Sequence, residues 1–193
     1  MIKKVCVYCA SSDKVAESYF AGAAHLGRAL AEAGVTIVYG GGSSGLMGRL
    51  ADAALAAKGQ VVGIIPHFMT EVEWQHNGLT KLVLVNDMHE RKRLFLEEVD
   101  AVVTLPGGCG TLEELLEVIT LKRLGVFTRP IIIVNQDGYY DPLVTMLEKA
   151  ISEKFMGEQH RDIWSVVDRV DRVLEAIAQA PPWQSDAIKR AKA

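Results

Sequence analysis

Residues 101–114 read AVVTLPGGCGTLEE, and this stretch decides the fold. The apolar run over residues 101–105 predicts a buried strand, and Leu112, Leu115 and Ile119 at helical spacing predict a helix after it. Between the two lies a loop with one proline and three glycines. A strand that runs through a glycine-rich loop into a helix is a building unit of parallel α/β sheets.

The same alternation of apolar runs and helical stretches extends along the chain. Seven runs predict strands, namely Lys4–Cys9, Val35–Tyr39, Gln60–Ile65, Lys81–Val85, Ala101–Leu105, Ile131–Val134 and Ile163–Val167. Because these runs are continuously apolar, we expect both faces of each strand to be buried. Helices are expected at Phe20–Ala31, Leu46–Lys58, Met88–Val99, Leu112–Leu124, Pro142–Lys154 and Arg169–Ala178. The pattern predicts a doubly wound, Rossmann-like parallel sheet with helices on both faces, in one domain over residues 1–180 with a tail at 181–193.

Composition excludes several functional classes. The 193 residues carry a formal net charge of −3, which gives no general attraction to nucleic acid or to an anionic membrane. The three cysteines Cys6, Cys9 and Cys109 are too few and too irregularly spaced for a disulfide framework. No stretch has the length of a signal peptide's apolar region or of a membrane span, so we expect a cytosolic protein. The five histidines lack metal-ligand spacing, and no metal or other cofactor is predicted.

Glycines also follow the second predicted strand, in the stretch GGGSSGLMG at residues 40–48. Backbone N–H groups of Gly41, Gly42 and Gly45 can approach a phosphate closely there, and the next helix adds its positive end. A tight turn with close helix packing is the alternative interpretation. The following strand has no acid at its end, which argues against a dinucleotide-dependent oxidoreductase.

The loop at residues 106–111 is a more specific candidate site. Thr111 and Glu114 fit the capping-box pattern, with Thr111 as the N-cap of the following helix. That pattern does not explain the three glycines just upstream, which are suited to admit a ligand. Glu114 and Glu117 lie one turn apart on a face separate from the apolar stripe, so both are candidate catalytic or binding carboxylates.

A third feature is the charged segment at residues 87–92, which opens another helix. Asp87 and Glu90 fit a capping role. Arg91 shares helical spacing with the apolar Met88 and Phe95, although arginine is rarely buried unless paired. Its planar fork suits phosphate or carboxylate, and a snorkelling or structurally salt-bridged arginine is the alternative.

The cysteines are weaker candidates. Cys6 and Cys9 form C-x-x-C, but three residues apart on a strand their side chains point to opposite faces, so core packing is favoured. Cys109 has no histidine or other base near it in sequence, which disfavours a nucleophilic role.

From Lys3 to about Val167 the chain resembles the Lonely Guy family of cytokinin-activating phosphoribohydrolases, which are often mislabelled lysine decarboxylases. The resemblance rests on the 40–48 loop, on MHERK at residues 88–92 and on PGGxGTxxE at residues 106–114. It implies a homodimer that hydrolyses the N-glycosidic bond of purine nucleoside 5′-monophosphates, either AMP or N6-modified cytokinin nucleotides. Arg91 and Glu114 would then be catalytic. The implied nucleotide contacts are Glu73, Lys92, Gly108, Cys109, Gly110, Thr111, Glu117 and Thr120.

Two departures from the family pattern concern the pocket. Cys109 stands where the family often has an aromatic residue, and Leu121 and Lys122 stand where plant-like members commonly have Trp and Gln. Both bear on substrate preference more than on reaction class. The alternative function is a carrier of a phosphorylated ligand that resembles the molybdenum-cofactor carrier proteins and performs no turnover.

Overall fold

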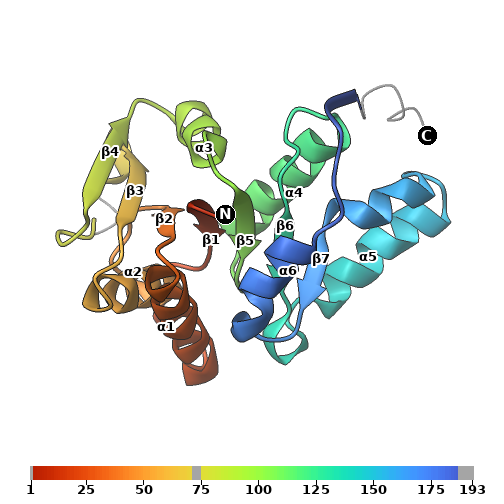
Figure 1. Ribbon diagram of the computed structural model, residues 1–193. Helices are drawn as coiled ribbons and strands as arrows, with labels where there is room; N and C mark the ends of the chain where they lie inside the picture. Colours follow the sequence, from red (N-terminus) through yellow and green to blue (C-terminus); the bar gives the residue numbers. More distant parts are fainter. Residues whose placement is uncertain (1, 71–74, 187–193) are drawn as a thin grey trace.

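Seven parallel strands form one sheet in the computed structural model of this chain, which describes residues 2–70 and 75–186 (Figure 1). The strands lie in the order β4-β3-β2-β1-β5-β6-β7. Their bounds are β1 Lys4–Tyr8, β2 Thr36–Tyr39, β3 Val61–Pro66, β4 Lys81–Val85, β5 Ala101–Thr104, β6 Ile131–Val134 and β7 Ser165–Val167. Every predicted strand is therefore confirmed, with ends that differ by at most about two residues, as expected for boundary assignments.

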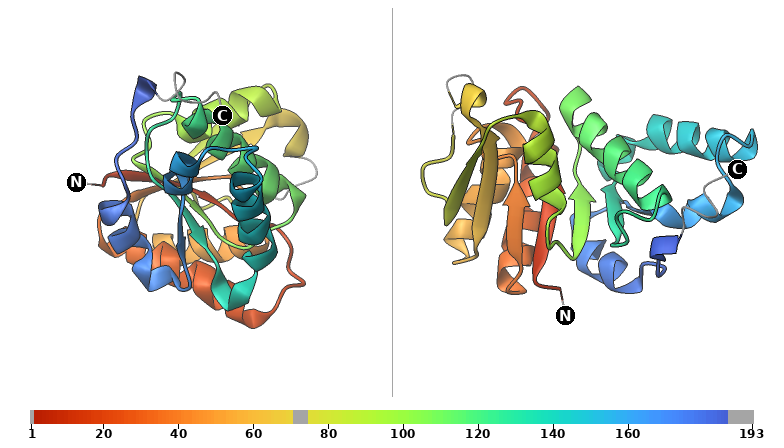
Figure 2. Two further views of the ribbon diagram at one scale, coloured as in Figure 1. Left: turned by 90° about the vertical axis from the view of Figure 1, so that its right-hand side faces the viewer. Right: turned by 90° about the horizontal axis from the view of Figure 1, so that it is seen from above.

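Helices cover both faces of this sheet, as Figures 1 and 2 show. Their bounds are α1 Glu17–Glu32, α2 Gly45–Ala56, α3 Met88–Leu96, α4 Cys109–Arg123, α5 Asp141–Ser152 and α6 Val173–Gln179. Apolar residues of α1, α2 and α6 form one buried cluster with the sheet, and those of α3, α4 and α5 form a second cluster on the opposite face. The predicted doubly wound architecture is confirmed.

Some expectations about individual elements are wrong. The two edge strands are not buried on both faces, since Leu84 of β4 is 46% exposed and Val166 of β7 is 41% exposed. Helix α3 ends at Leu96, short of the expected Val99. Helix α6 is preceded by a 3₁₀ turn at Val170–Arg172, so its first regular turn starts later than expected.

The start of α4 also differs from the expectation. The helix begins at Cys109, its N-cap is Gly108, and no side chain caps it. Thr111 therefore lies inside the first turn, where it is 5% exposed, and the predicted capping box with Glu114 is wrong. The glycine-rich loop enters the helix directly, which leaves the first backbone N–H groups of α4 without a side-chain cap.

The order of the strands defines where a ligand binds in such a fold. From β1 the chain moves outward through β2, β3 and β4, and then crosses back to β5, which pairs with β1. The loop after β1 leads to α1 on one face, whereas the loop after β5 leads to α4 on the other. Loops that diverge in this way open a crevice at the carboxyl ends of the two strands.

A membrane-spanning helix is not found in the part of the chain that the structure describes: none of its helices combines the necessary length and apolarity.

Candidate active site

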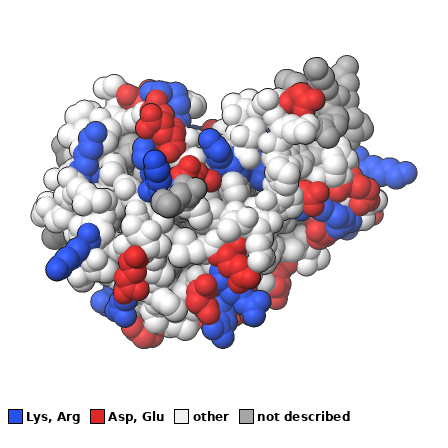
Figure 3. All heavy atoms as spheres, viewed as in Figure 1, with Lys and Arg blue, Asp and Glu red and all other residues white. Residues whose placement is uncertain are grey.

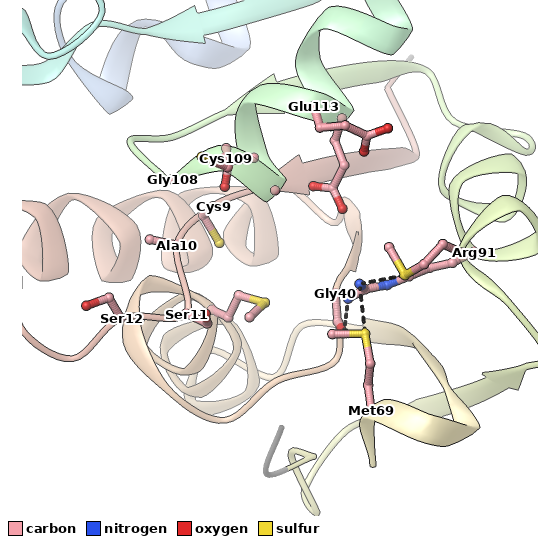
Figure 4. Close-up of a pocket in the computed structure, with 15 residues that line it drawn as sticks. Cys9, Ala10, Ser11, Ser12, Gly40, Met69, Arg91, Gly108, Cys109 and Glu113 are labelled. Atoms are coloured by element: carbon pink, nitrogen blue, oxygen red, sulfur yellow. Dashed lines mark hydrogen bonds between the residues drawn. The ribbon is translucent and has the colours of Figure 1, made fainter. Parts of the chain in front are cut away.

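A cavity of about 400 Å³ lies at the carboxyl ends of β1 and β5 (Figure 4). It collects residues from separate parts of the chain, and the sheet order brings them together. The lining residues are Cys9, Ala10, Ser11, Ser12, Gly40, Met47, Met69, Met88, Arg91, Gly108, Cys109, Gly110, Thr111, Glu113 and Glu114. Two predicted features, the loop at 106–111 and Arg91, therefore meet at one site.

The start of α4 presents backbone donors to this cavity. By helix geometry the N–H groups of Cys109, Gly110 and Thr111 have no partner within α4, and the positive end of the helix lies beside them. Gly107 is required by packing, since a Cβ there would lie 2.1 Å from Thr111 Oγ1. At Gly108 and Gly110 a Cβ would meet no heavy atom within 4 Å. Neither packing nor a positive φ demands glycine at these two positions, and the space beside them is open.

Arg91 is held in the wall of the cavity by backbone carbonyls. Its Nε donates to Ile64 O at 3.0 Å and its Nη2 donates to Gly40 O at 2.9 Å. The guanidinium also lies 5.2 Å from the centroid of the Phe95 ring, and the residue is only 5% exposed. A Cβ on residue 40 would lie 2.8 Å from Nη2, so this approach needs a glycine. Arg91 is therefore not a snorkelling side chain, and among residues 2–70 and 75–186 it forms no ion pair with a carboxylate. Its Nη1 edge is directed to the cavity residues Met69 and Met88.

Helix α4 carries three carboxylates, two of which line the same cavity as this arginine. Glu113 and Glu114 line the cavity, and Glu114 is half-buried. Burial raises the pKa of the thiols of Cys6 and Cys9, and the negative charge of Glu114 raises it further. Glu114 thus lies above the carboxyl end of β1, where its charge reaches both thiols.

Lys92 forms ion pairs with the other two carboxylates of α4. Its Nζ lies 2.6 Å from Glu113 Oε1 and 3.2 Å from Glu117 Oε2. The hydrogen bond with Glu113, followed by that with Glu117, raises the pKa of the Lys92 ammonium. Glu113 is a cavity residue that the sequence analysis missed, because its charge alone does not distinguish it from a solvated helix position.

The cysteines lie as their spacing predicts. Cys6 belongs to the buried cluster on the α3–α5 face and Cys9 to the cluster on the α1–α2 face. Cys9 and Cys109 both line the cavity, and Cys109 is exposed at the start of α4. The raised pKa of the Cys9 thiol keeps it protonated, which is unsuited to a nucleophile.

Other lining residues were missed by the sequence analysis. Ser11 and Ser12 follow β1, and their signal was available, because the loop after a central strand is a standard ligand position. Met47, Met69 and Met88 form a thioether wall, which we call the methionine wall. Nothing in the sequence marks these methionines as different from core residues.

Several predicted site residues do not line this cavity. Gly45 N donates to Asp13 Oδ1 at 2.7 Å, so a carboxylate of the chain itself already occupies the start of α2. Gly41 and Gly42 lie beside residues 75 and 76, through a bridge of Gly42 with Gln75 and a bond from His76 N to Gly41 O. Ligand contacts of Gly41, Gly42 and Gly45 stay predictions.

Lys92, Glu117 and Thr120 lie farther along α3 and α4. Lys92 and Glu117 line a neighbouring cavity of about 430 Å³. Thr120 Oγ1 donates to Leu116 O at 2.8 Å within α4. Glu73, which the family resemblance implies as a nucleotide contact, lies outside the described residues. These roles also stay predictions.

The surface around the site carries both signs of charge. On the face drawn in Figure 3, Lys and Arg side chains are interspersed with Asp and Glu rather than gathered into one basic area. The lining of the cavity is mixed in the same way, with the basic Arg91 and the acidic Glu113 and Glu114.

Fold and site together define an α/β protein of Rossmann-like architecture with a pocket suited to a phosphorylated ligand. A sequence model described as "Possible lysine decarboxylase" matches residues 47–177. A cytokinin riboside 5′-monophosphate phosphoribohydrolase of Arabidopsis thaliana is 36% identical over 188 residues, which are 97% of this chain and 88% of the plant protein. An enzyme of that name from Rhodococcoides fascians is 42% identical over 176 residues, which are 91% of this chain and 89% of the bacterial enzyme. The chain belongs to this Lonely Guy family.

Solved structures with the same fold include molybdenum-cofactor proteins. The carrier protein of Chlamydomonas reinhardtii has a TM-score of 0.69 at 17% identity, and the superposition covers 93% of this chain and 98% of the carrier chain. The cofactor-binding protein of Rippkaea orientalis has a TM-score of 0.70 at 19% identity, with coverage of 92% and 96%. At these identities the similarity shows a shared fold only.

Proposed function

We propose that this protein hydrolyses the N-glycosidic bond of purine nucleoside 5′-monophosphates, namely AMP, N6-modified cytokinin nucleotides or both, to the free base and ribose 5-phosphate. The names of its relatives support this reaction. The observation that carries the proposal is that Arg91 and Glu114 line the same cavity as the uncapped start of α4.

The two ends of the cavity suit the two ends of a nucleotide. In Figure 4, Ser11, Ser12, Gly108 and Cys109 lie at one end, whereas Arg91 and Met69 lie at the other. Serine hydroxyls and the free N–H groups of α4 would bind the 5′-phosphate. The ribose would then lie between them, below the carboxylates of α4, and the base would contact the methionine wall.

This placement brings Glu114 to the reacting carbon. Cleavage of the C1′–N bond builds positive charge on the ribose, and a carboxylate near C1′ stabilises that charge. Water supplies the oxygen bonded to C1′, and the base leaves with a proton on its nitrogen. Phosphate binding at the far end would supply remote binding energy that orients the sugar.

A carrier without turnover is less consistent with these residues. A site that only holds an anion gains nothing from Glu113 and Glu114 in its wall, since like charges repel. We further propose the homodimer and the cytosolic location implied above, neither of which the carrier alternative requires or excludes.

A 5′-phosphate should be required for turnover. We expect AMP to be cleaved at least about tenfold faster than adenosine at equal concentration, because adenosine lacks the group that the α4 donors would hold. Release of adenine, measured by chromatography, provides the rate. Equal rates would remove the phosphate from the proposal.

Substitution of Gly110 should separate ligand binding from folding. A Cβ at this position is in open space, and alanine is a better helix former, so Gly110→Ala should leave the thermal midpoint unchanged or raise it. We expect the KM for AMP to rise about tenfold, because the methyl group obstructs approach to the helix start. Gly107→Ala is the contrasting variant: its Cβ would overlap Thr111, so its midpoint should fall. An unchanged KM in Gly110→Ala would contradict the phosphate site.

A further inference from the structure

The edge of Arg91 that faces the cavity contacts two thioethers. Nη1 lies 3.6 Å from Met69 Sδ and 3.9 Å from Met88 Sδ, and Figure 4 shows this approach at Met69. Nε and Nη2 are already bonded to backbone carbonyls. A thioether is a weak acceptor, so these contacts leave Nη1 available for exchange with a substrate group.

Two of the three methionines of the methionine wall can be reached by a small reagent that enters the cavity. Met69 and Met88 are partly exposed and line the cavity, whereas Met47, the third member of the methionine wall, is 6% exposed. A reagent that enters the cavity therefore meets two thioethers beside the guanidinium. Oxidation converts such a side chain from an apolar group into a polar one.

We propose that a peroxide oxidises Met69 and Met88 to methionine sulfoxides. The sulfoxide oxygens then bind Arg91 and inactivate the protein reversibly. The inference rests on the proposed function in that Arg91 must be needed for turnover. One oxygen passes from the peroxide to the thioether: the O–O bond breaks, an S–O bond forms, sulfur loses two electrons and the peroxide is reduced to water. A thiol-dependent methionine sulfoxide reductase returns the sulfur to the thioether.

The consequence for Arg91 follows from distance and charge. A sulfoxide oxygen on Met69 would lie within hydrogen-bond reach of Nη1, since its sulfur is 3.6 Å away. A bond between a guanidinium and this strong acceptor is charge-assisted, unlike the contact with the thioether. Sulfoxide oxygens on Met69 and Met88 would then compete with a substrate group for the N–H donors of Nη1.

Thiol oxidation in the same cavity must be separated from this reaction. Cys109 is exposed there, and peroxide converts a thiol to a sulfenic acid or a disulfide. A small thiol reductant reverses both of those products but leaves a methionine sulfoxide unchanged. Only sulfoxide reductases of both epimer specificities restore the methionine.

The test compares peroxide-treated and untreated samples of each variant with AMP as substrate. After treatment and full thiol reduction, wild type should be at least about tenfold less active, and the two reductases together should restore it. Met69→Leu/Met88→Leu, which preserves side-chain volume, should keep more than about half of its own untreated activity. Met146→Leu removes a methionine that is 62% exposed on α5, away from the cavity, and should lose as much activity as wild type.

Peptide mapping by mass spectrometry measures the oxidation of each methionine in the wild-type protein, without any substitution. Residual activity should fall in proportion to the added oxygen on the peptides that carry Met69 and Met88. The inference is overturned if these residues are fully oxidised in an active protein, if thiol reduction alone restores activity, or if the double variant is as sensitive as wild type. Failure of the proposed function is a different result, namely no adenine release before any peroxide is added.

Discussion

Glu114→Gln should lower AMP hydrolysis by at least about a hundredfold while the protein keeps its fold, since this is the typical loss on removing one preorganised electrostatic partner. Glutamine has nearly the same size as glutamate but no charge to place near C1′. The N-cap of α4 is Gly108 rather than Thr111, so Glu114 does not complete a capping box with Thr111. We therefore expect the thermal midpoint to shift by less than about 2 °C. Steady-state kinetics and a thermal melt of the same preparation provide both values.

Glu117→Gln is the matched control for this substitution. It lies on the same helix one turn later, pairs with Lys92 as Glu113 does, and lines the neighbouring cavity rather than the candidate active site. Its activity should stay within about threefold of wild type, as for the loss of an exposed ion pair. A larger loss in Glu117→Gln than in Glu114→Gln would show that the catalytic carboxylate is misassigned.

Arg91→Lys should abolish most activity although the charge is retained. Lysine has a single ammonium, which cannot bond Gly40 O and Ile64 O and also present a donor to the cavity. We expect turnover to fall at least about a hundredfold. Because two bonds from a buried side chain are lost, the free energy of unfolding should also fall, by about 1–3 kcal/mol. Steady-state kinetics, measured below the thermal midpoint of the variant, give the loss of turnover. A denaturant titration gives the change in the free energy of unfolding.

Arg93→Lys serves as the comparison on the same helix. Its side chain is 64% exposed and its only described ion pair is with Glu97, so both activity and stability should match wild type. Near-normal turnover in Arg91→Lys would return Arg91 to a purely structural role. It would also leave the inactivation proposed for Met69 and Met88 without a target.

The architecture could be predicted from the sequence because the inner strands of a parallel sheet bury both faces. Runs such as residues 131–134 carry an apolar signal without alternation, and glycines mark the loops that follow β2 and β5. Helix ends were less accessible. The start of α4 was misplaced because Thr111 and Glu114 satisfy a local capping pattern, whereas the chain uses Gly108 as the cap and buries Thr111.

The site could be predicted from the sequence only in part, because local patterns do not show which distant residues meet. Arg91 and the loop at 106–111 stand out locally, the arginine by its place on an apolar stripe and the loop by its glycines. The assignment of Gly45 to a ligand rested on a local pattern, and the structure shows Asp13, which is distant in sequence, at that helix start. Met47 and Met69 reach the same site as Arg91 through the order of the strands, which no local pattern contains.

Product analysis with a nucleotide tests the central claim most directly. The protein is incubated with AMP and, separately, with an N6-prenylated adenosine 5′-monophosphate, and the mixture is separated by chromatography. We predict the free base and ribose 5-phosphate in equal amounts from at least one of the two, and none from the Glu114→Gln variant. Recovery of both nucleotides intact, with either bound tightly to the protein, would contradict the hydrolase and favour the carrier.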